Sequence, residues 1–238
     1  MNIGQISYGK LSLKTDYLQL DICGLSAEES KEKYLKHLNS TTLDSIPILL
    51  HGDWTKKGCS ENNIKERIID YIKIIKVLSE ITTIKGFTIH PPSRKKVPLD
   101  TFIDLCNQIT KKTGVEVFIE NRSNKTLSCS NLEEINKVLE TNFMTIDIPQ
   151  LYISLGYNYN LLLSTLDSLK WENIKEIHLA NLVKEPKNTY VGRQLEDEKG
   201  VFNIKNFKKY LQKVDYVTLE ILGGIKIFEK NKDYLLSI

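Results

Sequence analysis

Short runs of apolar, largely β-branched residues recur along the chain, and they constrain its fold more than any other feature of the sequence. Most of these runs are followed by a longer stretch with helical spacing of apolar residues. The runs are almost continuously apolar, which is typical of strands buried on both faces of a parallel sheet. The eight runs are NIGQISY, YLQLDI, IPILLHGDW, GFTIHPP, VEVFIEN, FMTIDIP, IKEIHLAN and YVTLEIL.

The number of runs matches the length of the chain. Eight strands in 238 residues give about 30 residues per unit, the size of one βα repeat. We therefore predict an α/β fold, a single (β/α)8 TIM barrel that spans residues 1–238 as one domain without a linker. Only Gly9 to Asp16 separates the first two strands, so the first helix is expected to be short or missing.

Several helix starts can be predicted from local sequence. Ser26–Glu29 and Ser130–Glu133 both read S-x-x-E, the pattern of a capping box. Pro98 favours the start of a helix over Leu99–Lys112. Apolar residues near helical spacing over Ile64–Leu78 predict a helix with one face on the sheet.

Composition excludes few classes of function. The chain has 33 Lys and Arg against 30 Asp and Glu, a net charge of +3, which is too small to indicate a nucleic-acid partner. Four scattered cysteines form no C-x-x-C motif, and the first residues lack the apolar core of a signal peptide. No run approaches the roughly 20 apolar residues of a membrane span. We expect a reduced, cytoplasmic protein that does not enter a membrane.

Polar residues close most of the apolar runs. In a (β/α)8 barrel the active site lies at the C-terminal ends of the strands. Several carboxylates that meet at a buried barrel mouth would repel one another unless a cation holds them, and imidazoles beside them are further metal ligands. The sequence therefore predicts a divalent metal site at the mouth. The strand-end residues are His51, His90, Glu120, Asp147, His178 and Glu220.

This series of strand-end residues resembles that of the xylose isomerase-like TIM barrels over nearly the whole chain. The motifs that carry the resemblance are His51, His90-Pro91, Glu120-Asn121, Asp147, His178-Leu179 and Glu220. The superfamily contains sugar isomerases and epimerases, inosose dehydratases, and apurinic endonucleases of the endonuclease IV type. The resemblance implies the fold and leaves the reaction open.

In the isomerase and epimerase branch, the resemblance implies one Mn, Mg, Co or Zn ion held by Glu120, Asp147, His178 and Glu220. The metal would bind the oxygens of an α-hydroxy ketone or aldehyde, and Glu120 and Glu220 would be the catalytic bases that move the proton through an enediolate. The implied substrate is a small sugar, sugar phosphate or keto-polyol. A homodimer is also compatible with this branch.

The endonuclease IV branch uses three zinc ions, and His51 and His90 match the histidines that it places after the third and fourth strands. They would form a second metal site that shares Glu120, as in a two-metal hydrolase of phosphodiesters with nucleic acid as its partner. The third site lacks its residues, because Gln150 stands where that branch has a histidine and Gly192–Gln194 stand where it has an Asp-x-His pair. A barrel without catalytic activity is the third hypothesis.

Four residues outside the metal set are candidates for substrate binding. Trp54 could line a sugar face or pack on the following helix. Arg122 could hold a phosphate or carboxylate, or pair with a barrel carboxylate. Lys184 and Arg193 lie in the segment after His178, which could close over a substrate or form a surface loop.

Overall fold

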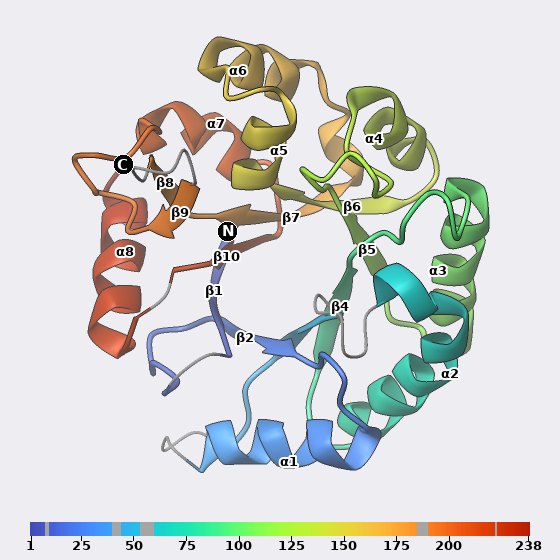
Figure 1. Ribbon diagram of the computed structural model, residues 1–238. Coiled ribbons are helices and arrows are strands. Elements are labelled where there is room, and N and C mark those ends of the chain that lie inside the picture. The colour runs from blue at the N-terminus through green and yellow to red at the C-terminus, as the bar shows by residue number, and fades with distance from the viewer. Residues whose placement is uncertain (8–9, 40–43, 53–59, 185–189, 222) are drawn as a thin grey trace.

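Eight parallel strands close into a barrel in the computed structural model (Figure 1). The strand order is β1-β10-β7-β6-β5-β4-β3-β2, so the first and the last strands of the chain pair with each other. This confirms the predicted (β/α)8 TIM barrel. The barrel strands are β1 (Asn2–Ile6), β2 (Tyr17–Asp21), β3 (Ile48–His51), β4 (Ile84–Ile89), β5 (Val117–Glu120), β6 (Phe143–Asp147), β7 (Ile174–Leu179) and β10 (Tyr216–Leu219).

Helices surround the barrel in Figure 1. The structure describes residues 1–238 except 8–9, 40–43, 53–59, 185–189 and 222, and it describes only the backbone of 60–63, 184 and 190–192. No helix in the described part is long and apolar enough to cross a membrane. The helices are α1 (Ala27–Leu38), α2 (Ser60–Ser79), α3 (Leu99–Thr113), α4 (Leu132–Leu139), α5 (Ile148–Ser154), α6 (Tyr159–Ser168), α7 (Lys208–Leu211) and α8 (Ile225–Ser237), with 3-10 turns η1 (Trp171–Asn173) and η2 (Ile204–Phe207).

An antiparallel hairpin follows β7 and was not predicted. It consists of β8 (Asn181–Lys184) and β9 (Tyr190–Arg193). Its base is fixed by the buried side chain of Asn181, whose amide nitrogen donates to the carbonyl oxygens of Leu195 and Phe202 at 3.1 Å each. The hairpin begins two residues after the end of β7, which carries His178.

The predicted helix starts are correct at two of three positions. Ser26 accepts from the backbone N–H of Glu29, and Glu29 closes the predicted capping box of α1. Helix α3 begins at Leu99, directly after Pro98. The predicted start of α4 was wrong by one residue, because Asn131 and not Ser130 caps this helix. The hydroxyl of Ser130 instead accepts from Arg94 at 2.8 Å.

No helix connects β1 and β2 in the described residues, as the short spacing predicted. Side chains of the connection bind the backbone of β1 instead. Asp16 accepts from the N–H of Ile3 at 2.7 Å, and Thr15 accepts from the N–H of Gln5 at 3.0 Å. Lys232 of α8 donates to Asp16 at 2.9 Å. This hydrogen bond links α8 to the connection between β1 and β2.

Aromatic side chains form the floor of the barrel, at the end opposite to the strand C-termini. Tyr17 and Phe118 pack there with Leu49, and glycines make room for both rings. A Cβ atom on Gly4 would lie 2.1 Å from the ring of Tyr17, and one on Gly86 would lie 2.4 Å from the ring of Phe118. The two rings therefore pack directly against the backbone of neighbouring strands at this end of the barrel.

We predict that Gly86→Ala destabilises the protein by about 1–3 kcal/mol, because the added methyl group overlaps the Phe118 ring and forces strain on the core. Urea unfolding measures this loss. The double variant Gly86→Ala/Phe118→Leu should be more stable than the sum of the two single effects predicts, since the smaller side chain leaves room for the methyl group. Strict additivity of the two effects would contradict this packing.

Candidate metal centre

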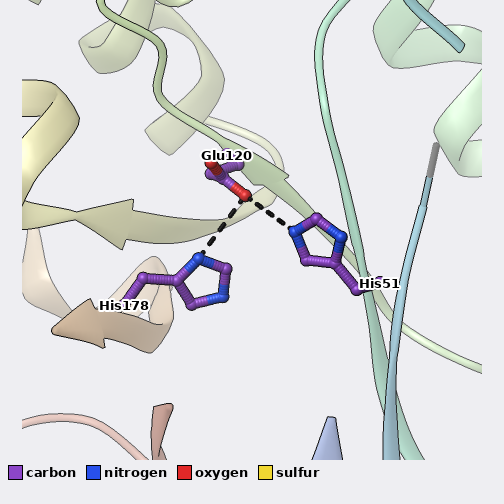
Figure 2. Close-up of side chains that lie close together, drawn as sticks. All are labelled: His51, Glu120 and His178. Carbon is purple, nitrogen blue, oxygen red and sulfur yellow. Dashed lines mark hydrogen bonds and ion pairs between the residues drawn. The ribbon is translucent and has the colours of Figure 1, made fainter. Parts of the chain in front are cut away.

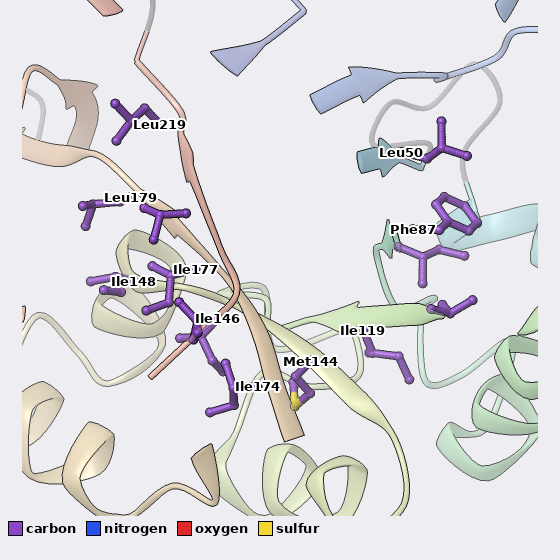
Figure 3. Packing of buried hydrophobic residues seen from close by; sticks show 14 of the residues in the cluster. Leu50, Phe87, Ile119, Met144, Ile146, Ile148, Ile174, Ile177, Leu179 and Leu219 are labelled. Carbon is purple, nitrogen blue, oxygen red and sulfur yellow. The ribbon is translucent and has the colours of Figure 1, made fainter. Parts of the chain in front are cut away.

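The six predicted strand-end residues meet at the C-terminal mouth of the barrel. Five of them are buried, whereas the side chain of Glu220 is 30% exposed. Residues alternate between the two faces of a strand, so their neighbours along the chain point outward and pack against the helices. These neighbours include Leu50, Ile119, Ile146, Ile177, Leu179 and Leu219 (Figure 3).

Glu120 lies at the centre of the site. Its Oε2 atom is 3.3 Å from His51 Nε2, 3.1 Å from His90 Nε2 and 3.5 Å from His178 Nδ1. Figure 2 shows two of these contacts, those to His51 and His178. The other oxygen, Oε1, accepts from Arg122 at 2.7 Å. Burial raises the pKa of Glu120, but the surrounding histidines outweigh burial and hold that pKa well below its usual range.

Two sets of three side chains place their ligand atoms within 4.8 Å of one another. The first is His51, Glu120 and His178, and the second is Asp147, His178 and Glu220. His178 belongs to both, so the sets form one continuous group of donors. Imidazoles combined with carboxylates suit Zn, Mn and related divalent ions.

The Nδ1 atom of His178 provides a test of whether these residues fit a metal ion. It is buried and makes no hydrogen bond with any residue that the structure describes. It lies 3.3 Å from an oxygen of Glu220 and 3.5 Å from one of Glu120. A buried nitrogen without a hydrogen bond is costly unless another partner satisfies it, and a cation between these ligand atoms would do so. The donor set therefore fits a divalent ion.

Asp147 is held in place from two sides. Asn121 donates from its amide to the carbonyl oxygen of Asp147 at 3.1 Å and accepts from the Asp147 N–H at 2.8 Å, which joins the ends of β5 and β6. One oxygen of Asp147 caps α5 by accepting from the N–H of Gln150 at 2.7 Å. Burial, followed by the charges of Glu220 and Glu120, raises the pKa of Asp147 well above its usual value. A bound cation would remove this repulsion.

Glu176 lies directly beneath the centre, and it was missed in the sequence analysis. It is fully buried and precedes His178 by two residues, so both side chains face the barrel interior. Its Oε2 atom is 3.3 Å from His178 Nε2. Burial raises the pKa of Glu176, but the charge of His178 and the donated hydrogen bonds lower it overall. The donors are Gln19 at 3.1 Å, Thr145 at 2.8 Å, Thr218 at 2.5 Å, and Thr88.

The four candidates for substrate binding have different positions. The NH1 atom of Arg122 contacts Glu120 and also lies 3.1 Å from His90 Nε2, so this side chain belongs to the metal centre. Arg193 ends β9 and is exposed. Lys184 ends β8, but its side chain lies outside the described part of the chain, and Trp54 lies outside the described residues altogether.

Solved structures resemble this chain over nearly its full length. One is "IOLI protein with a binding zinc atom", at 15% identity with a TM-score of 0.66, covering 100% of this chain and 98% of that one. A second is endonuclease IV from Thermus thermophilus, at 12% identity with a TM-score of 0.63, covering 100% and 98%. A third is a xylose isomerase domain-containing protein from Salmonella typhimurium, at 10% identity with a TM-score of 0.66, covering 99% and 96%. The chain has the fold of the xylose isomerase-like TIM barrels.

No family model and no curated protein matches this chain. At 10–15% identity the structural neighbours establish the fold alone. The side chains at the barrel mouth must therefore decide between the reactions that such barrels carry out.

The metal-free barrel should lose stability in acid, partly through His90. Burial lowers the pKa of His90 from 6.5 to about 3; Arg122 acts in the same direction and Glu120 opposes it. Between these two pH values the unfolded chain binds a proton that the folded chain does not. The free energy of unfolding therefore decreases by up to about 1.4 kcal/mol for each unit by which the pH is lowered. Urea unfolding with a chelator between pH 7 and pH 4 measures this slope. His90→Gln should flatten it, and an unchanged slope would contradict the assignment.

Proposed function

We propose that this protein is a divalent-metal-dependent isomerase or epimerase of a small sugar, sugar phosphate or keto-polyol. The observation that carries the proposal is that His178 joins two groups of ligand atoms at the barrel mouth, one with Glu120 and one with Asp147 and Glu220. These four donors would hold one Mn, Mg, Co or Zn ion. The bound zinc in the IolI structure supports the choice of a metal, since that protein shares this fold.

The bound ion would supply a positive charge that stabilises the enediolate of an α-hydroxy ketone or aldehyde. Proton transfer then falls to carboxylates. Glu220 suits this role best, because its side chain is 30% exposed and can meet a substrate at the mouth. Glu120 is the second proposed base, but its side chain is 1% exposed and both of its oxygens have partners. Glu120 therefore acts mainly as a ligand in this proposal.

A second candidate is a two-metal hydrolase of phosphodiesters, with nucleic acid as its partner. It is favoured by the position of His51, which joins Glu120 and His178 in one ligand group, and by the distance of 3.1 Å from His90 to Glu120. Endonuclease IV shares the fold. The contacts of Arg122 count against it, because a cationic side chain already contacts both His90 and Glu120.

The proposed function is tested with a panel of ketoses, aldoses and their phosphates, assayed after loading with Mn, Co, Mg or Zn. We expect one of these substrates to exchange its α-proton with solvent deuterium, and Glu220→Gln to reduce that exchange at least about 100-fold. Glu133→Gln on the exposed face of α4 is the matched control and should behave as wild type. Cleavage of an abasic-site duplex without any activity on the sugar panel would favour the hydrolase instead.

A further inference from the structure

Arg122 bridges two members of the metal centre with a single nitrogen atom. Its NH1 atom donates to Glu120 Oε1 at 2.7 Å and lies 3.1 Å from His90 Nε2. A guanidinium group carries only donors and stays charged at any pH that a folded protein meets. In the contact with Arg122, His90 Nε2 must therefore accept the hydrogen bond. An N–H of the arginine occupies the lone pair of this nitrogen.

The same lone pair would be needed to bind a second metal ion. His90 Nε2 also lies 3.1 Å from Glu120 Oε2, and with Nε2 unprotonated both of these atoms are acceptors. Two acceptors this close repel each other unless a positive charge lies beside them. Arg122 supplies that charge, as a second metal ion would in a dinuclear centre.

His51 differs from His90 in this respect. Its Nδ1 atom lies 3.1 Å from the carbonyl oxygen of Gly52, and donation to that oxygen leaves Nε2 as the ligand nitrogen. His51 accordingly belongs to a group of three potential metal ligands, whereas His90 belongs to neither group found among the described residues. The Nε2 atoms of both histidines approach Glu120 Oε2, but only that of His90 also contacts the arginine.

We propose that the guanidinium of Arg122 is a built-in cation that takes the place of a second metal ion and keeps this centre mononuclear. The inference rests on the proposed function in one respect, which is that the mouth of the barrel binds metal. It assigns Arg122 to the metal centre as a positioning residue that sets the number of ions. It also implies that removal of this side chain converts the centre into a dinuclear one.

The experiment counts metal ions per chain. Wild type, Arg122→Met, Arg122→Gln and Arg122→Lys are dialysed to equilibrium against excess Co²⁺, and bound metal is measured by plasma mass spectrometry. We expect one additional equivalent in the two neutral variants and none in Arg122→Lys, which keeps a positive charge. Adding His90→Gln to Arg122→Met should remove the additional equivalent, and anomalous scattering at the cobalt edge should place that ion beside His90.

Several outcomes would overturn the inference. The neutral variants could bind as many ions as wild type, Arg122→Lys could gain an ion as they do, or wild type itself could bind two. The count for wild type is a separate test of the proposed function. A wild type without metal would overturn the metal-dependent isomerase and this inference with it, whereas a wild type with one ion and no gain in either neutral variant would overturn the inference alone. Two neutral variants guard against one that fails to fold, which circular dichroism would detect.

Discussion

Replacement of His178 by alanine should abolish tight metal binding. His178 is the one residue shared by both groups of ligand atoms, and its Nδ1 atom lies between carboxylate oxygens of Glu120 and Glu220. Loss of a residue that only orients a ligand costs about 10- to 100-fold in metal affinity, so loss of this ligand should cost more than about 100-fold. Calorimetric titration of the protein with Co²⁺ or Zn²⁺, after a chelator has removed bound metal, measures the change in affinity.

His37→Ala is the matched control for this variant. His37 lies on α1, away from the strand ends, and it is half-buried. We expect this substitution to leave the affinity for metal unchanged. Equal affinity of His178→Ala and wild type would show that the ion, if one binds, does not use the centre described above.

Replacement of Glu176 by leucine should weaken both the fold and the metal centre. The carboxylate accepts hydrogen bonds from Gln19 and three threonines, and it faces His178 Nε2 at 3.3 Å. Leucine leaves these buried donors without an acceptor, and breaking such a buried network costs about 3–5 kcal/mol. His178 also loses one of the two partners of its Nε2 atom, the other being Gln19 at 2.7 Å, which should weaken metal binding about 10- to 100-fold. Urea unfolding and metal titration measure the two effects separately.

Glu176→Gln separates the role of Glu176 in stability from its role in metal binding. The amide keeps the shape of the side chain and one acceptor oxygen, but it removes the negative charge that faces His178. We expect most of the stability to return while the metal affinity stays below that of wild type. If both Glu176 variants bind metal as tightly as wild type does, the buried carboxylate contributes to the stability of the barrel and not to metal binding.

The sequence was sufficient to predict the barrel and the position of its mouth. Strands buried on both faces are apolar along most of their length, so a polar residue at the end of such a run is conspicuous. Glu120 and Asp147 could be recognised in this way, since each ends its strand in the structure. The same reasoning failed for Glu176, because it lies near the middle of β7 and its partners come from four other strands. Its position two residues before His178 was the available signal.

Two other features depend on contacts that local sequence does not specify. Arg122 could be placed after β5, but the choice between a substrate and Glu120 as its partner depends on how a long side chain packs. The hairpin of β8 and β9 is fixed by hydrogen bonds from Asn181 to Leu195 and Phe202, which follow later in the chain. Strands of four residues carry too little periodicity to be recognised without these contacts.

The pairing of β1 with β10 has a consequence for the order of events during folding. Asn2 pairs with Tyr216, so a nascent chain keeps an open strand edge until β10 has left the ribosome. Glu220 follows β10 and is the last of the four proposed ligands to be synthesised. Such distant pairings form slowly. We therefore expect metal capture to be a late event that follows closure of the barrel and does not guide it.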